Sequence, residues 1–318
     1  MGRDGVVEKQ QPQSIANFAA ALRAAGLPFV PDEPLARHTT FHIGGPAPVF
    51  CQPETLPELT ASLALCRRHG VRHYLLGNGS NTLFADSGFD GAVISLARLR
   101  TRLTFTEHAD RAAVTVCAGA GMMLSALCGA AQKQGLTGLE FAYGIPGTVG
   151  GAVYMNAGAY GGEMKDVLTS VTYLDEKLHL ATLPATELSL GYRTSIFEQK
   201  PWCVVEVELS LQQGDAAEIE ARMQDFMLRR RTKQPLDLPS AGSTFKRPQG
   251  AFAGQLIEQC GLCGYTVGGA QISPKHCGFV VNLGGATCAD VVELTQHVKN
   301  IVLAQTGYTL EREIRVVE

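Results

Sequence analysis

Apolar residues recur along this chain with two different periods, which together predict a mixture of α-helices and β-strands. Spacings of three and four residues mark amphipathic helices, whereas alternation or short β-branched runs mark strands. The expected helices are at 54–69, 122–134, 215–231 and 287–301. The expected strands are at 48–51, 71–76, 92–96, 112–117, 171–174, 179–183, 205–211, 280–281 and 310–317.

Helix start and stop signals support these assignments. Gly70 follows the first helix, where a glycine commonly ends one. Asp215 stands three residues before Glu218 and resembles a capping box, and Thr287 is a favourable N-cap for the last helix. The strand 205–211 runs into Gln-Gln-Gly-Asp, a loop signal, so the best-supported domain boundary lies near residue 213.

Length and composition describe a globular protein. The chain has 318 residues, of which 45% are hydrophobic and 18% charged, enough for two domains with a large core. A net charge of -3 gives no general attraction to nucleic acid or to an anionic membrane, so we expect neither partner. The N-terminus has no secretory apolar segment, and the uncharged stretch 141–162 holds seven glycines, which argues against a lipid-buried helix. We therefore expect a cytoplasmic protein without membrane insertion.

The nine cysteines are scattered, which in a reducing compartment is typical of small core residues. Cys260 and Cys263 have the spacing of half a zinc knuckle, with Cys277 further on. Structural zinc sites usually show two tight ligand pairs, and Gly261 is better explained as the stop of a helix. We expect no metal.

Two glycine-rich segments are candidates for binding a ligand. The first follows an expected strand and consists of Gly77, Asn78, Gly79, Ser80 and Asn81. Successive N–H groups in such a turn form a concave anion site suited to a pyrophosphate. It is not GxGxxG and no clear helix follows it, so it does not read as a Rossmann fingerprint. Taken alone, it is explained slightly better as a tight turn.

The second segment is GIPGTVGGA at 144–152, continuing as NAGAYGG at 156–162. A long uncharged loop must satisfy its backbone groups if it is buried, and a large, partly polar ligand such as a dinucleotide would do so. Glycines would also let the backbone approach that ligand closely. A close-packed turn between domains is the alternative explanation.

Few charged residues stand out from the pattern. Arg193, in GYRTSIF, could hold an anion by paired hydrogen bonds. The arginine run 229–231 ends a helix, where cations stabilise the dipole, so its structural explanation is the stronger one. Glu313 shares the polar face of the last expected strand with Glu311 and Arg315, and periodicity alone does not mark it as catalytic.

One loop, PSAGSTFKRP at 239–248, raises a chemical question. Its prolines bracket a non-helical segment, and Gly242 gives the backbone before Ser243 unusual freedom. A lone serine in such a loop is most often a turn or cap residue. The loop by itself does not decide between a turn and a reactive serine.

Together these segments resemble the UDP-N-acetylenolpyruvoylglucosamine reductase family, flavoenzymes that complete the UDP-muramate precursor of peptidoglycan. Each motif is weak alone, but the set runs in the family's order from about residue 35 to the end of the chain and is highly specific. The matching stretches are HTTF, IGGPA, GNGSN, GIPGTVGGAVYMNAGAYGGE, GYRTSIF, RRRTKQP, AGSTFKRP, GGAQISPKH and LEREIRV.

The resemblance implies an α+β fold. An FAD-binding domain of the vanillyl-alcohol-oxidase (PCMH) type, made of two α/β subdomains, would precede a smaller α/β substrate-binding domain. The expected divisions are an N-terminal extension at 1–34, an FAD-binding domain at 35–213 with subdomains near 35–98 and 99–213, and a substrate-binding domain at 214–318.

The resemblance also implies roles for individual residues. Ser243 corresponds to the family's proton donor, and Arg193 and Glu313 to its other catalytic residues. The substrate would be bound by Lys246, Arg247 and Tyr192. Non-covalent FAD would lie on the Gly77–Asn81 loop and on Gly144, Ile145, Pro146, Gly147, Gly150 and Gly151.

The implied reaction is NADPH-dependent reduction of UDP-N-acetylglucosamine enolpyruvate to UDP-N-acetylmuramate through FAD. Hydride delivery to the enol ether leaves a strongly basic carbon beside a carboxylate, and such a carbon can take a proton even from a serine hydroxyl. Arg193 and a protonated Glu313 would stabilise the enolate. The expected partners are this substrate and NADPH, and the expected state is a monomer.

The chain differs from one version of the family. About forty residues separate Phe197 from Ala241, which leaves no room for the tyrosine-bearing loop that some members fold over the substrate. This indicates the shorter class, in which the side chain that replaces that tyrosine is open. Arg247 stands where the longer class carries asparagine, which favours a charge-assisted hold on the diphosphate.

Two other functions compete with the reductase. The first is an oxidase on the same scaffold, but such relatives often tether FAD to a histidine near the pyrophosphate loop, and the sequence has none between His73 and His108. The second is a nucleotide-binding module without chemistry, against which the three catalytic motif positions argue.

Overall fold

The computed structural model describes residues 10–99, 102–107 and 113–318. Backbone contacts divide them into two compact units. Unit 1 takes the described residues up to Glu33, those of 47–77 and those of 90–227. Unit 2 takes 34–46, 78–89 and 228–318. The division into functional domains, with a boundary near 213, stays a prediction. The last boundary between the compact units lies between 227 and 228.

The first layer of unit 1 is a small sheet with helices packed beside it. Strand β5 lies at the centre of the parallel part, between β2 and β3, so Val93 faces Phe50 on one side and Tyr74 on the other. Sheet order is β1-β2-β5-β3. The elements are β1 (Phe29–Pro34), β2 (Pro46–Cys51), β3 (His73–Leu76), β5 (Ala92–Ser95), α1 (Gln10–Ala24) and α2 (Leu56–His69).

Helix α2 forms as its sequence predicts. The Thr55 hydroxyl accepts a hydrogen bond from the Glu58 backbone N–H at the N-terminus, and Gly70 ends the helix with φ of 62°.

Helix α1 was not predicted. Its Phe18 and Leu22 side chains are fully buried in the same core as Leu59 of α2, so tertiary packing accounts for this helix.

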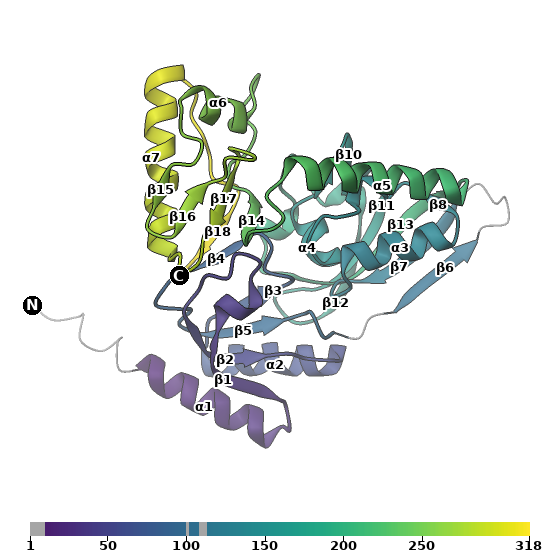
Figure 1. The fold of residues 1–318 in the computed structure, drawn as a ribbon. Helices are drawn as coiled ribbons and strands as arrows, with labels where there is room; N and C mark the ends of the chain where they lie inside the picture. Colours follow the sequence, from purple (N-terminus) through teal and green to yellow (C-terminus); the bar gives the residue numbers. More distant parts are fainter. Residues whose placement is uncertain (1–9, 100–101, 108–112) are drawn as a thin grey trace, which may run out of the picture. The chain divides into compact units, whose positions relative to one another are not determined.

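The second layer of unit 1 is a larger antiparallel sheet in the order β12-β11-β13-β7-β6, with β8 also paired to β13. Figure 1 shows α3 and α4 lying over this sheet. The strands predicted at 171–174 and 179–183 are both present and form an antiparallel hairpin, in which Val171 of β11 pairs with Leu183 of β12. The elements are β6 (Leu103–Glu107), β7 (Val114–Gly119), β8 (Leu136–Thr137), β11 (Leu168–Leu174), β12 (Leu180–Pro184), β13 (Cys203–Gln213), α3 (Leu124–Lys133), α4 (Val149–Tyr154) and α5 (Ala216–Lys233). Residue 112, the first of one predicted strand, lies outside the described residues.

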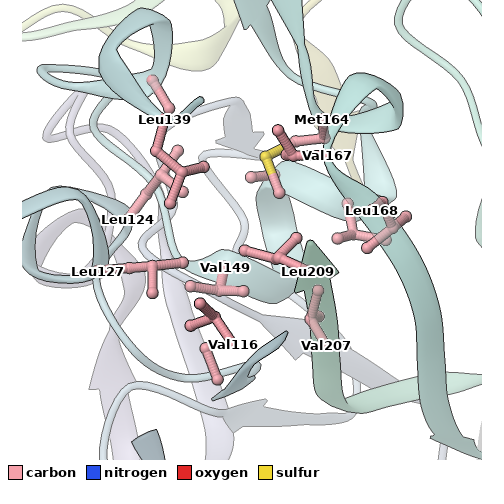
Figure 2. Packing of buried hydrophobic residues seen from close by; sticks show 14 of the residues in the cluster. Val116, Leu124, Leu127, Leu139, Val149, Met164, Val167, Leu168, Val207 and Leu209 are labelled. Carbon is pink, nitrogen blue, oxygen red and sulfur yellow. The ribbon is translucent and has the colours of Figure 1, made fainter. Parts of the chain in front are cut away.

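The core of this second layer consists mainly of aliphatic and aromatic side chains. Figure 2 shows Leu127 and Val149 from the helices next to Val116, Val207 and Leu209 from the sheet. All of these side chains are at least 98% buried. The alternation predicted for 205–211 places Val207 and Leu209 inward, as expected.

Unit 2 combines an antiparallel sheet, a parallel strand pair and two helices. The sheet order is β14-β17-β16-β15, and β18 pairs with β4 in parallel. The last helix, α7, begins with a capping box between Thr287 and Asp290, which confirms the predicted N-cap. The elements are β4 (Thr82–Phe84), β14 (Ser240–Ser243), β15 (Thr266–Val267), β16 (Ala270–Ile272), β17 (Phe279–Asn282), β18 (Arg315–Val317), α6 (Ala253–Gln259) and α7 (Cys288–Thr306).

The strand predicted at 310–317 is shorter than expected. Only β18 is a strand, because the backbone changes partners before it. The Glu313 N–H donates to the Thr244 carbonyl at 2.8 Å, whereas the Arg315 N–H donates to the Asn81 carbonyl at 3.0 Å. A segment that leaves one neighbour for another cannot form one continuous ladder.

The cysteine prediction is correct at one point and wrong at another. Helix α6 ends before Cys260, and Gly261 follows with φ of 69°, as expected of a helix stop. Cys263 and Cys277 were expected to be reduced, but they form a disulfide whose Cα atoms lie 5.5 Å apart. Spacing along the sequence could not reveal this pair, because the turn through β15 and β16 brings together residues that are 14 positions apart.

Within the described part of the chain, no helix combines the length and apolar character that a membrane crossing requires.

The buried position of Leu127 leads to a stability prediction. Leu127→Ala removes a fully buried side chain from the core of the second layer, so the free energy of unfolding should fall by about 2–5 kcal/mol. Urea denaturation followed by circular dichroism measures this change. Leu180→Ala is the matched control, because Leu180 is 54% exposed and its loss should cost less than about 0.5 kcal/mol. Equal losses in the two variants would show that the core is assigned wrongly.

Candidate active site

The two glycine-rich segments meet inside unit 1. Gly77 follows β3 and lies against Thr148, the N-cap of α4, so closely that a Cβ on Gly77 would stand 2.7 Å from the Thr148 hydroxyl oxygen. A second close approach anchors the other segment, because a Cβ on Gly150 would stand 2.7 Å from the Ala120 Cβ. A larger residue at position 77 would collide with Thr148, and one at position 150 would collide with Ala120, which accounts for glycine at both positions.

The run 144–162 is more regular than the single loop that the sequence indicated. It contains α4 and the short hairpin of β9 (Gly158–Ala159) and β10 (Gly162–Glu163). Several of its N–H groups have protein partners: that of Val149 donates to the Met122 carbonyl, and that of Gly150 donates to the Ala120 carbonyl. The expectation that a ligand must satisfy this backbone was therefore too strong. What the run offers a ligand is a half-exposed, uncharged surface at Gly144, Ile145 and Gly151.

In unit 2, the other end of the first glycine-rich segment reaches the C-terminal strand. The Asn81 side-chain amide donates to the Glu313 carbonyl at 3.1 Å, and the Glu313 N–H donates to the Thr244 carbonyl at 2.8 Å. These two bonds connect Asn81, Glu313 and the residue next to Ser243. Three of the predicted site positions are thus close together in the backbone of one unit.

The strand that carries Ser243 is irregular at the position where the sequence suggested unusual backbone. Ser240 pairs with Val281 and Ser243 pairs with Phe279, with a shift of register between them. Gly242 lies in this shift with φ of 75°, a conformation that glycine adopts without strain. The Ser243 side chain is exposed, and Glu313 is half-buried. The bulge therefore turns a small hydroxyl outward at the end of β14.

Both basic residues after Ser243 already have partners in the protein. The Lys246 ammonium contacts a carboxylate oxygen of Glu311 at 2.5 Å, and the Lys246 side chain is 29% exposed. The Arg247 guanidinium lies 3.8 Å from the centre of the Phe252 ring. Glu311 is 69% exposed, so its ion pair with Lys246 is one that an incoming phosphate could replace.

Arg193 and Tyr192 lie in unit 1 on a tight turn. The backbones of Gly191 and Thr194 form two hydrogen bonds with each other, and Arg193, which lies between them, has φ of 56°. Its guanidinium donates to the Gly158 carbonyl at 3.0 Å and lies 5.2 Å from the centre of the Tyr192 ring. Tyr192 is 51% exposed.

Four of the buried cysteines lie in surroundings that keep their thiols protonated. Burial raises the pKa of the thiols of Cys51, Cys66, Cys128 and Cys203 to about 12, so these groups stay protonated near neutral pH. Among the residues that the structure describes, no group of three or more His, Cys, Asp or Glu side chains is placed to hold a metal ion.

Comparison with known proteins decides the family. The chain is 45% identical over 286 residues to the UDP-N-acetylenolpyruvoylglucosamine reductase of Caldanaerobacter subterraneus, covering 90% of this chain and 92% of the relative. It is 46% identical to the enzyme of the same name from Clostridioides difficile, with the same coverage. The chain belongs to the UDP-N-acetylenolpyruvoylglucosamine reductase family.

Domain and structure comparisons agree with this assignment. The C-terminal domain of UDP-N-acetylenolpyruvoylglucosamine reductase matches residues 234–317, and an FAD binding domain matches 47–180. The crystal structure of the reductase from Thermus caldophilus superposes with a TM-score of 0.74 at 35% identity, covering 92% of this chain and 99% of that one. The resemblance drawn from sequence motifs is confirmed, and so is the α+β fold with its FAD-binding domain.

Chemistry and shape at the glycine-rich segments fit the flavin that this reductase family uses. The FAD-binding match covers both segments, and the run 141–162 carries no charged side chain that would repel a pyrophosphate. The half-exposed backbone of Gly77 and Asn78 adds N–H groups of the kind that bind anions.

Two residues important to this geometry were not singled out from the sequence. Thr148 is buried and contacts Gly77, and Asn156 is fully buried and bonded to the turn that carries Arg193. Both lie within the glycine-rich run. The sequence did carry a signal for them, because each is a polar residue within an uncharged run. If such a run is buried, its polar side chains need hydrogen-bond partners.

Proposed function

We propose that this chain reduces UDP-N-acetylglucosamine enolpyruvate to UDP-N-acetylmuramate with NADPH, and that Ser243 donates the proton. Its family makes it an FAD-dependent oxidoreductase of peptidoglycan precursor synthesis. The single observation that supports the assignment of residues is the pair of hydrogen bonds that runs from the Asn81 side chain through the Glu313 backbone to Thr244, next to Ser243. Those contacts tie the predicted flavin loop to the predicted proton donor.

The flavin would be held by backbone rather than by charged side chains. The residues proposed to hold it are Gly77, Asn78, Gly79, Ser80, Asn81, Gly144, Ile145, Pro146, Gly147, Gly150 and Gly151. When bound, FAD supplies hydride transfer between NADPH and the enol-ether carbon. The close fit of Gly77 to Thr148 supports this site, because it brings the two segments into one surface.

The proton step suits a serine. Hydride addition to the enol ether leaves negative charge on the carbon next to a carboxylate. This carbon is a strong base, so it can take a proton even from a weak acid such as a serine hydroxyl. The Ser243 hydroxyl is exposed at the bulge in β14, where the O–H can donate to that carbon. A positioned proton donor is worth about 10²–10⁴-fold in rate.

Arg193 and Glu313 would stabilise the charge that develops. The Arg193 guanidinium donates one hydrogen bond to the Gly158 carbonyl, which would fix its direction toward the enolate. A protonated Glu313 would donate a hydrogen bond to the enolate oxygen. Fixed donors of this kind are worth about 3–4 kcal/mol each in comparable sites.

The diphosphate would be bound by Lys246 and Arg247, and Tyr192 would contact the substrate. In this arrangement the phosphate replaces Glu311 as the partner of Lys246. The Arg247 guanidinium packs against the Phe252 ring, and a guanidinium can present two N–H groups to one phosphate. The chain is proposed to act as a cytoplasmic monomer, with residues 35–213 as the flavin domain and 214–318 as the substrate domain.

Ser243→Ala tests the proposed proton donor. NADPH should still bleach the flavin at the wild-type rate, whereas reoxidation by the enolpyruvyl substrate should slow by about 10²–10⁴-fold, since only the second half-reaction needs the proton. Stopped-flow absorbance under anaerobic conditions measures both rates. Ser240→Ala, at the other end of β14, is the matched control and should leave both rates unchanged. Normal reoxidation in Ser243→Ala would remove Ser243 from the mechanism.

Gly79→Ala tests whether the first glycine-rich loop holds the flavin. Gly79 has φ of 63°, and a Cβ there would stand 2.8 Å from the Thr39 Cα and would overlap the His38 carbonyl. The loop must therefore shift, and the purified variant should lose most of its FAD. Flavin content per protein, read from absorbance, measures the loss.

Gly70→Ala is the control for this loop variant, because Gly70 has φ of 62° but no atom within 4 Å of a Cβ. Both variants carry the same left-handed strain of about 1–2 kcal/mol. If Gly79→Ala retains as much FAD as Gly70→Ala, the loop does not bind the cofactor.

A further inference from the structure

The turn that carries Arg193 is strained, and the segment beside it contains a second left-handed residue. Arg193 has φ of 56° and Asn156 has φ of 41°. Asparagine adopts this conformation more readily than most residues, whereas at arginine it is uncommon and persists only where surrounding contacts hold it. The contacts that hold these two residues join the same two segments of unit 1, 154–165 and 191–195.

Two hydrogen bonds run between these segments in opposite directions. The Asn156 side-chain N–H donates to the Gly191 carbonyl at 2.9 Å, and the Arg193 guanidinium donates to the Gly158 carbonyl at 3.0 Å. Each segment therefore gives a side-chain donor to the backbone of the other. The Gly191 carbonyl also accepts from the Thr194 N–H, so Asn156 holds the turn at the residue that closes it.

Burial and hydrogen bonds hold the Asn156 side chain in one orientation. Its side chain is fully buried, and its amide makes three hydrogen bonds. Besides the bond to Gly191, its N–H group donates to Glu163 at 2.7 Å, and its oxygen accepts from the Lys165 N–H at 2.9 Å. The opposite orientation of the amide would place its oxygen against two acceptors, so the network fixes the orientation.

Glu163 extends the network away from the turn. One oxygen of its carboxylate accepts from Asn156, and the other forms an ion pair with Lys165. Glu163 and Asp166 also form a capping box that fixes the short helix after β10. The orientation of the Asn156 amide is thus set by a carboxylate that is itself held in place.

We propose that Asn156 is a positioning residue that fixes the guanidinium of Arg193 in the reduction reaction. This inference rests on the proposed role of Arg193. Asn156 does not touch the reacting atoms: it holds the Gly191 carbonyl, the turn presents Arg193, and the Gly158 carbonyl aims the guanidinium.

A double-mutant cycle tests the inference. Asn156→Ala should slow flavin reoxidation by the enolpyruvyl substrate by about 100-fold, since an error of about 1 Å in placing a group can cost that much. The rate of flavin reduction by NADPH should not change. In an Arg193→Ala background, the same substitution should add less than about a twofold effect, because the group that it positions is already gone.

Asn282→Ala is the matched control, because Asn282 is a second buried asparagine. Its amide forms hydrogen bonds with the backbone of Phe41, Gly284 and Ala286. Any effect of this control should be equally large with and without Arg193. Hydrogen exchange on the flavin-free protein gives an independent readout. Exchange at the Thr194 N–H should speed up in Asn156→Ala and stay unchanged in Asn282→Ala.

The outcomes separate the two proposals. If Arg193→Ala is slow but the effects of Asn156→Ala and Arg193→Ala multiply, the positioning role is wrong and the role of Arg193 stands. If Arg193→Ala reoxidises at the normal rate, the role of Arg193 falls and this inference falls with it. Should Asn156→Ala fail to fold, Glu163→Ala removes the acceptor that orients the same amide and takes its place in the cycle, with the same criteria.

Discussion

The contact on which the proposed site depends most is the approach of Gly77 to Thr148. The Thr148 side chain, which caps α4, lies directly against Gly77, so the turn after β3 lies close to the first turn of α4. The same kind of fit occurs where Gly150 lies on Ala120 at the end of β7. These two contacts hold α4 close to the turn after β3 and to the end of β7. We propose that the half-exposed backbone of Gly77 and Gly151 beside them takes part in binding the pyrophosphate.

Much of the fold could be predicted because local signals agreed with tertiary demands. Thr55 and Gly70 bracket α2, and Thr287 begins α7, each with the hydrogen bonds that such residues usually make. The alternation in β13 also gave the correct inward face. Helix α1 was missed although Phe18 and Leu22 are spaced for one face, because small alanines narrow its apolar stripe and its stability comes from packing on α2.

The parts that could not be predicted depend on contacts between distant segments. The last strand was expected to be continuous, yet its backbone moves from Thr244 to Asn81 as partner within three residues. The disulfide between Cys263 and Cys277 likewise depends on a turn and not on sequence spacing. Arg193 is the clearest example at the site, since no propensity marks an arginine for a left-handed turn. Motif resemblance named the residue, whereas only the structure gives a physical reason for how it is held.

The proposed function depends on glycine-rich backbone that binds FAD and on transfer of hydride from this FAD to the enol ether of the substrate. Its most direct test is the anaerobic absorbance spectrum of the purified protein, recorded alone, after one equivalent of NADPH, and after UDP-N-acetylglucosamine enolpyruvate is added. The purified protein should be yellow, NADPH should bleach it, and the enolpyruvyl substrate should restore the yellow colour. A protein that carries no flavin, or a bleached flavin that stays bleached when the substrate is added, would contradict it.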